Sequence, residues 1–170
     1  MSSVTRKSGG RRKARREAIV TDMLRVVEEL MEDGASFADI TVEQLITEAG
    51  ISRSTFYVYF EDKGVLLLAL AEDVVGRLID AARVWWELPP DGTRADVESA
   101  LRGIADVYAQ HASIWSALVD TSAYDPNVRA SFRGVVALAI EGVSRHIREG
   151  QKAGTVRAGL DPKRTAAWLT

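Results

Sequence analysis

The sequence predicts an all-α protein, on the strength of three observations. Along most of the chain, apolar residues recur at three- and four-residue spacing, the period of an amphipathic helix. Glycine and proline signals divide this pattern into segments of helical length. No stretch alternates apolar and polar residues as a half-buried strand does, and no hairpin dipeptide stands between two such stretches. We therefore expect helices joined by short loops.

The first helix is expected from about Arg15 to Gly34, where the glycine ends it. One apolar stripe at helical spacing supports it. The stripe consists of Ile19, Met23, Val26, Val27, Leu30 and Met31.

Two short helices joined by a tight turn are expected next, over residues 41–60. Thr41 and Gln44, three positions apart, form a capping box that opens the first of them. Gly50 can take the left-handed conformation that ends this helix, and Ser52 can cap the second. Together they predict a helix-turn-helix motif.

Further helices are expected in the rest of the chain. Asp62 can cap a long helix, and two Asp-Pro pairs, at 125–126 and 161–162, are typical helix starts. The expected helices span 63 to about 88, 94–110, 113–123, 126 to about 149 and, after a loop at 150–159, 162 onward.

Composition excludes several classes of protein. The 170 residues include no cysteine, so disulfides, thiolate nucleophiles and Cys-ligated metal sites are excluded. The longest apolar run, 65–71, is far shorter than the roughly 18 residues of a membrane span. The basic N-terminus is not followed by the apolar stretch of a secretory signal. We expect a cytoplasmic protein that does not enter a membrane.

The charge is distributed unevenly along the chain. Residues 1–16 carry seven basic side chains and no acidic one, whereas the other 154 residues carry 15 basic and 24 acidic groups. A Ser/Gly-rich start without periodicity predicts a flexible basic arm over residues 1–14. Arg11 and Arg12 in this arm either bind DNA phosphates, with release of counterions, or belong to a solvated tail that aids solubility.

The second helix of the motif has the residues that major-groove reading requires. Phe56 and Phe60, four positions apart, can form an apolar rear face. Arg53 carries a fork of donors that matches guanine O6 and N7. The side chains that can face outward are Arg53, Ser54, Tyr57 and Val58, and the hydroxyls that can donate to phosphates are those of Ser52, Thr55, Tyr57 and Tyr59.

Lys63 is expected in the first turn of its helix, where the helix dipole disfavours a cation. Two explanations are open. An external phosphate would remove the penalty, or Glu61 and Asp62 neutralise the charge locally.

One multi-residue pattern spans these helices. It consists of Thr41-Val42, Ala49-Gly50-Ile51-Ser52 and Thr55-Phe56-Tyr57-Val58-Tyr59-Phe60, with Lys63 and Leu67. The pattern resembles the DNA-binding signature of TetR/AcrR-type transcriptional regulators, and residues 50–57 are especially similar to the EthR-like subgroup. The strong resemblance covers residues 15–70. Beyond it, only the number and spacing of helices agree.

The resemblance implies a helix-turn-helix DNA-binding domain over 15–62 and a helical effector-binding and dimerisation domain over 63–170. Such regulators usually have two further helices at the dimer interface, so this domain is expected to be truncated, or to dimerise through another surface such as the stripe 132–147. The resemblance also implies residue roles: Thr41 braces the backbone or touches phosphate, Arg53, Ser54 and Tyr57 contact bases or the groove, and Thr55, Tyr59 and Lys63 hold phosphates.

Two residues depart from the usual pattern of this family. Ile46 stands where a small alanine is common, and Gly64 replaces a common glutamate. The first is expected to alter the packing of the two short helices, and the second to weaken the start of the long helix.

Aromatic residues on successive helices of the second half are candidates for an effector site, because pockets in helical bundles are mostly apolar. The alternative for each ring is a place in the core. These residues are Trp85, Trp86, Tyr108, Trp115, Tyr124 and Phe132.

Together these features predict a homodimeric, sequence-specific DNA-binding regulator. We expect a repressor that a small hydrophobic effector releases from a palindromic operator. The alternative is a helical ligand- or protein-binding module whose helix-turn-helix no longer reads specific DNA. His111 and His146 lack carboxylates at metal-ligand spacing, and catalytic motifs are missing, so we expect no enzyme, cofactor, metal or catalytic residue.

Overall fold

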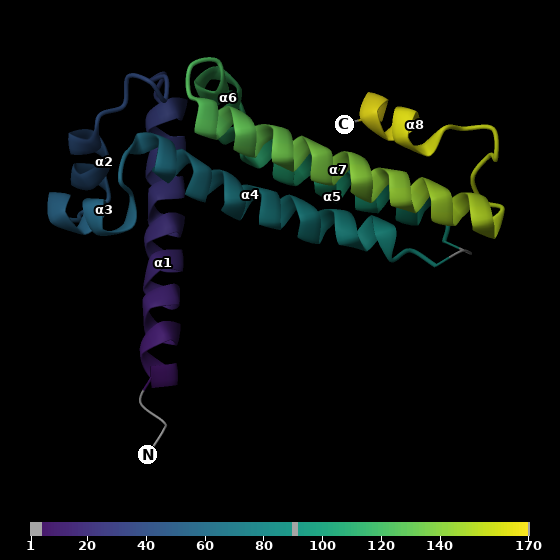
Figure 1. Ribbon diagram of the computed structural model, residues 1–170, viewed down its shortest axis with the longest axis horizontal. Helices are drawn as coiled ribbons and strands as arrows, with labels where there is room; N and C mark the ends of the chain where they lie inside the picture. The colour runs from purple at the N-terminus through teal and green to yellow at the C-terminus, as the bar shows by residue number, and fades with distance from the viewer. Residues whose placement is uncertain (1–4, 90–91, 170) are drawn as a thin grey trace. The chain divides into compact units, whose positions relative to one another are not determined.

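The computed structural model describes residues 5–89 and 92–169, with side chains from Gly10 onward (Figure 1). Within these ranges every regular element is an α-helix, so the predicted all-α class is confirmed. None of the helices in this part of the chain is long and apolar enough to cross a membrane. The helices are α1 (Thr5–Glu32), α2 (Val42–Glu48), α3 (Arg53–Tyr59), α4 (Lys63–Trp86), α5 (Arg94–Gln110), α6 (Ala112–Ser122), α7 (Pro126–Ala153) and α8 (Pro162–Leu169).

The chain divides into two compact units. The first unit holds the described residues of Met1–Val74 together with His111–Val128. The second holds Val75–Gln110 and Arg129–Thr170, again as far as they are described. The first unit therefore contains more than the helix-turn-helix segment, because it includes the first half of α4 and all of α6.

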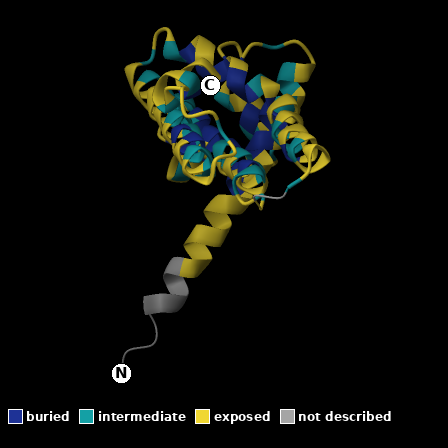
Figure 2. Ribbon diagram, turned by 90° about the vertical axis from the view of Figure 1, so that its right-hand side faces the viewer, coloured by how far each residue is buried: buried dark blue, intermediate teal, exposed yellow. Residues whose placement is uncertain are grey.

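The core of the first unit forms where α1, α2, α3, α4 and α6 bury their apolar stripes. Residues 10–18 of α1 take no part, since they are exposed (Figure 2). A polar link ties α1 to α6 inside this unit, where Nδ1 of the buried His111 lies 2.6 Å from Oε1 of Glu28. The largest fully buried side chains are Met23, Val26, Val27, Ile40, Leu45, Phe56, Phe60, Leu66, Leu67, Leu70, Ile114 and Leu118.

The second unit has a smaller core. The predicted apolar stripe of α7 is mostly half-buried, with Ile147 buried near its end. The buried Ser144 hydroxyl donates to the carbonyl of Pro162 at 3.3 Å, and Ala166 is buried, which packs α8 within this unit. On α5, Ala100 is the residue that is buried.

Two helix boundaries differ from the prediction by more than two residues. Helix α1 begins at Thr5 rather than about Arg15, so the part of the predicted flexible arm from residue 5 onward is helical. The segment from residue 11 is rich in Arg, Lys and Ala, which favour helices, and Lys13 pairs with Glu17 at 3.8 Å. Residues 1–4 of that arm lie outside the described residues.

Helix α7 continues to Ala153, so the prediction of a loop from residue 150 was wrong at its start. Gly154, not Gly150, takes the left-handed conformation, with a φ of 77°. Its N–H donates to the carbonyl of Gln151, and the N–H of Thr155 donates to that of Gly150, which closes the helix.

Candidate nucleic-acid interface

Helices α2 and α3 form a helix-turn-helix whose ends are capped as predicted. The N–H of Thr41 donates to Oε1 of Gln44 at 2.8 Å, and the N–H of Gln44 donates back to the Thr41 hydroxyl at 3.2 Å. At the turn, Gly50 has a φ of 63°. The Ser52 hydroxyl accepts from the N–H of Thr55 at 3.0 Å and so caps α3. Both helices therefore begin at the caps that the local sequence predicts.

Helix α3 has one buried and one exposed face. The rings of Phe56 and Phe60 are fully buried, with centroids 5.4 Å apart. On the opposite side, Tyr57 is 45% exposed and Val58 is 75% exposed. An apolar side chain as exposed as Val58 contributes nothing to the core of this unit. The arrangement matches the predicted rear and front of a helix that enters a groove.

Arg53 lies at the start of this exposed face. Its guanidinium group forms an ion pair with the carboxylate of Glu43 in the first turn of α2. It also lies 5.6 Å from the centre of the Tyr57 ring, within range of a cation–π contact. Sequence reasoning missed Glu43, because the two residues are ten positions apart and only the helix-turn-helix geometry makes them neighbours.

Three predicted hydroxyls meet at the start of α3. The Ser52 oxygen lies 2.9 Å from that of Ser54 and 2.8 Å from that of Thr55. Ser52 and Ser54 are exposed, and Thr55 is half-buried. Tyr59 is also half-buried, with its ring 6.4 Å from that of Phe60. Two of the hydroxyls predicted to hold phosphates, those of Ser52 and Thr55, thus lie together with Ser54, which was predicted to contact bases or the groove, and the predicted phosphate ligand Tyr59 is partly covered.

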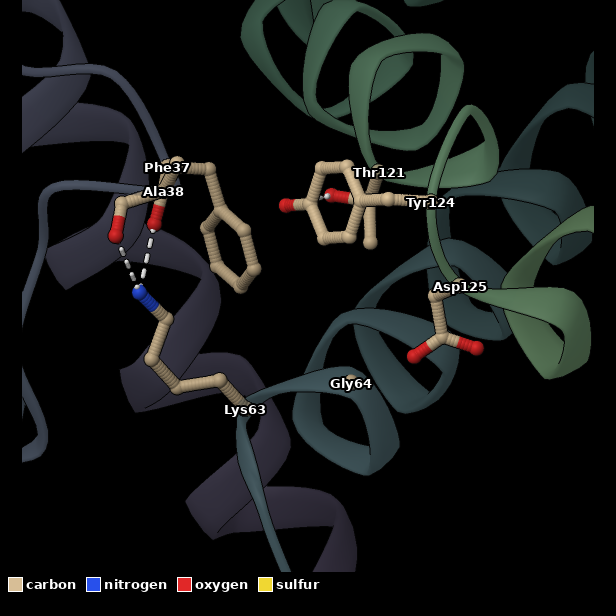
Figure 3. Close-up of a pocket in the computed structure, with 7 residues that line it drawn as sticks. All are labelled: Phe37, Ala38, Lys63, Gly64, Thr121, Tyr124 and Asp125. Carbon is tan, nitrogen blue, oxygen red and sulfur yellow. Dashed lines mark hydrogen bonds between the residues drawn. The ribbon is translucent and has the colours of Figure 1, made fainter.

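The structure gives Lys63 partners that neither open explanation included. Its ammonium group donates to the carbonyl oxygens of Phe37, at 2.8 Å, and Ala38, at 2.9 Å (Figure 3). It also donates to the carbonyl oxygen of Ile40. Partial burial lowers the pKa of Lys63, and the nearby Asp39 carboxylate acts in the opposite direction. Three carbonyl acceptors use all three ammonium protons. Lys63 therefore connects the turn before α2 with the start of α4.

A pocket of about 380 Å³ lies beside this connection, within the first unit. The rings of Phe37 and Tyr124 stand on facing sides of it (Figure 3). A side chain at Gly64 would place its Cβ 3.0 Å from Oδ2 of Asp125 and 3.1 Å from Oδ1 of Asp62. This close approach explains why a glycine fits at position 64. The lining residues are Phe37, Ala38, Lys63, Gly64, Thr121, Tyr124 and Asp125.

Arg11 and Arg12 lie on α1, and both are exposed. Lys13, Arg15 and Arg16 follow on the same exposed part of the helix. The cations therefore stand on a helix that continues into the core of the first unit, rather than on a separate arm.

The six aromatic candidates for an effector site are divided between the two units. Trp115 and Tyr124 belong to the first unit, where Trp115 is buried and Tyr124 is 64% exposed. The other four belong to the second unit, where they lie on α4, α5 and α7. These are Trp85, Trp86, Tyr108 and Phe132.

Within the second unit, two tryptophans have specific neighbours. The ring of Trp85 packs on that of His146, with centroids 4.5 Å apart. A Cβ at Gly142 would lie 3.2 Å from the Trp86 ring, so the glycine makes room for it. The indole N–H of Trp86 is buried and has no hydrogen-bond partner among the described residues. An unsatisfied buried donor of this kind suits a ligand that supplies an acceptor.

Comparison with known proteins places similarity over the helix-turn-helix. Residues 28–70 match the family described as bacterial regulatory proteins, tetR family. The HTH-type transcriptional regulator EthR of Mycobacterium tuberculosis is 34% identical over 108 residues, which cover 62% of this chain and 50% of that protein. EthR of Mycolicibacterium smegmatis is 42% identical over 81 residues, 45% of this chain and 36% of that protein. The chain thus spans about half the length, or less, of these relatives.

Solved structures share the fold over a longer stretch. Regulatory protein TetR from Rhodobacter sphaeroides superposes with a TM-score of 0.68 at 23% identity, over 88% of this chain and 81% of that one. Salmonella enterica GusR gives a TM-score of 0.72 at 18% identity, over 89% and 78% of the two chains. At such identities the likeness concerns the fold.

Proposed function

We propose that this chain is a member of the tetR family of bacterial regulatory proteins, which its residues 28–70 match, and that it binds a specific DNA operator and represses transcription there. The observation that carries the proposal is the two-faced α3, with Phe56 and Phe60 buried and Tyr57 and Val58 exposed. A helix held from behind in this way can lie in a major groove. Membership of a family of regulatory proteins also agrees with the prediction that the chain is not an enzyme.

Each part of the exposed face has a proposed role. Arg53 offers its remaining donors to guanine O6 and N7, with Ser54 and Tyr57 beside it in the groove. Phosphates on either side are held by hydroxyls and by the cations of α1. Those groups are Thr41, Ser52, Thr55, Tyr59, Arg11 and Arg12.

Lys63 differs from the other proposed phosphate contacts because its ammonium group already has partners within the protein. Its ammonium protons are already donated to the carbonyls of the turn over residues 37–40. It can hold a phosphate only by releasing one of them. Its main proposed role is therefore to position α2 for the DNA contact.

We further propose that the protein acts as a homodimer in the cytoplasm, on a palindromic operator. Two copies of α3 would enter successive major grooves, about 34 Å apart. A small hydrophobic effector would bind the second unit beside Trp86, whose buried indole N–H suits an acceptor atom of the ligand. Binding that favours one arrangement of the dimer would then change its affinity for the operator.

A second candidate function has one observation in its favour. The ion pair with Glu43 places a negative charge on the face that would meet DNA. This candidate is a helical ligand- or protein-binding module whose helix-turn-helix no longer recognises specific DNA. Such a module would tolerate a negative charge on this face. The two functions differ in salt dependence, because DNA affinity falls steeply as salt rises and apolar partner binding does not.

Selection of bound genomic fragments tests the proposed function. The purified chain is mixed with sheared genomic DNA, and the retained fragments are sequenced. We expect enrichment of a palindrome with half-sites about one helical turn, or a multiple of it, apart. Retention of fragments without a shared sequence would refute specific DNA binding and favour the second candidate.

A further inference from the structure

Glu43 and Arg53 make an ion pair at the meeting point of α2 and α3. Glu43 lies in the first turn of α2, and Arg53 is the first residue of α3. Their side chains are 63% and 60% exposed. The Tyr57 ring lies 5.6 Å from the Arg53 guanidinium carbon, so the guanidinium group has a partner on two sides and is still open to solvent.

Stability of the fold does not explain this ion pair. An ion pair between exposed side chains contributes little to stability, because water screens both charges. The structure places this one between the two helices of the proposed DNA interface. An acidic side chain on such a face opposes binding to the phosphate backbone.

We propose that Glu43 is a specificity-determining residue of the DNA interface. It positions the Arg53 guanidinium group for one guanine of the operator and weakens binding to other DNA sequences. This inference rests on the proposed function. It adds a role for a residue outside the predicted set of DNA contacts.

The first part of the role is positioning. A guanidinium group has five N–H donors in a planar fork, so it can donate to Glu43 and still offer donors to guanine O6 and N7. A fork that is already held loses less freedom when it binds the base. At the operator, the contact between Arg53 and guanine therefore contributes its full binding free energy.

The second part is discrimination against other sites. Pairing with Glu43 neutralises the Arg53 charge, so this arginine contributes less to attraction by phosphates in any sequence. Where the base pair offers no acceptors to the fork, the carboxylate still faces the negative DNA surface. Non-specific binding is therefore weakened more than operator binding.

The test compares E43Q with a matched control, E48Q. Glu48 is an exposed acidic residue at the other end of the same helix, so both variants remove one negative charge from α2. For the full chain and both variants, dissociation constants are measured for the selected palindrome and for a scrambled duplex of equal length, at several salt concentrations. The readout is the specificity ratio, which is the dissociation constant for the scrambled duplex divided by that for the palindrome.

We expect E43Q to lower this specificity ratio about tenfold, the contribution of one good base contact. Most of the change should be tighter binding to scrambled DNA, with a steeper salt dependence. E48Q should leave the ratio unchanged, and E43D, which keeps the charge, should retain most of it. In an R53A background, E43Q should no longer change the ratio, since Glu43 acts through Arg53.

An E43Q ratio equal to that of the unmodified chain, or a change of the same size in E48Q, would overturn the inference. If the unmodified chain itself shows no preference for the palindrome, the proposed function fails as well. A preference in the unmodified chain that E43Q leaves intact overturns the role of Glu43 alone.

Discussion

The ammonium group of Lys63 donates to the main-chain carbonyl of Phe37 at 2.8 Å and lies 5.1 Å from the centre of the Phe37 ring. The two residues are 26 positions apart. They join the start of α4 to the turn that leads into α2. The position of the helix-turn-helix on its supporting helices therefore depends on a side chain that reads, from sequence, as a phosphate ligand.

Lys63→Met should reduce the free energy of unfolding. The substitution keeps most of the apolar stem but leaves part-buried carbonyls of residues 37 and 40 without their donor, at a cost of about 1–3 kcal/mol. Urea denaturation measures the change, with Lys163→Met on the exposed side of α8 as control. A variant as stable as this control, with weaker binding to all DNA sequences, would show that Lys63 serves only as a phosphate contact.

Arg53→Ala should weaken operator binding by about 1–3 kcal/mol and relax the preference at one base pair. The reason is the loss of the donor fork that, in the proposed complex, would reach a guanine from the first turn of α3. Titrations of the selected palindrome and of its single-base variants measure both effects. Arg102→Ala, which removes an exposed arginine from α5, is the matched control. Equal losses for all duplexes would assign Arg53 to phosphates instead.

Two glycines of α7 should respond in opposite directions to alanine. At Gly150, the new Cβ would lie 2.5 Å from Cγ2 of Val156, a stiff side chain, so the loop after α7 must move. At Gly134, nothing lies within 4 Å, so alanine should stabilise the helix by roughly 0.5–1 kcal/mol. Thermal unfolding distinguishes them. A Gly150→Ala variant as stable as Gly134→Ala would contradict the described end of α7.

The free energy of unfolding should decrease as the pH is lowered, and His146 should be one cause of that decrease. Desolvation lowers the pKa of this imidazole, and Glu149 opposes the shift. Because the unfolded chain keeps the ordinary value of about 6.5, its His146 binds a proton first. Stability is therefore full above that value and declines as the pH falls toward the lower pKa of the folded state.

Melting temperatures between pH 7.5 and pH 5 check this dependence. His146→Gln should have a shallower decline than the unmodified chain, and the difference removes the contribution of other groups. Tryptophan fluorescence should change over the same range, because the Trp85 ring packs on His146 at 4.5 Å. Identical slopes for both proteins would exclude His146 as their source.

Sequence was sufficient wherever the determinant is local. The capping box at Thr41, the Ser52 cap and the Asp125-Pro126 start all appear in the structure, because each involves residues two to three positions apart. The bounds of α5 also agree with the prediction. Similarly, the spacing of Phe56 and Phe60 was enough to predict the buried face of α3.

Long-range contacts could not be predicted in this way. The Glu43–Arg53 pair and the Lys63 connection join residues 10 to 26 positions apart, and neither follows from a helical repeat. The predicted end of α7 was also wrong, because both Gly150 and Gly154 could end the helix. Only the structure shows that Gly154 and not Gly150 adopts a positive φ. The aromatic residues of the second half were expected on successive helices, but that placement did not reveal their division between two units.

Titration of the unmodified chain with its selected palindrome and with a scrambled duplex tests the central claim most directly. Both duplexes have equal length and base composition, and the titrations are repeated at several salt concentrations. The account predicts binding to the palindrome at least about a thousandfold tighter, as in specific protein–DNA complexes, with affinity for both duplexes falling as salt rises. Equal affinities for the two duplexes would contradict it.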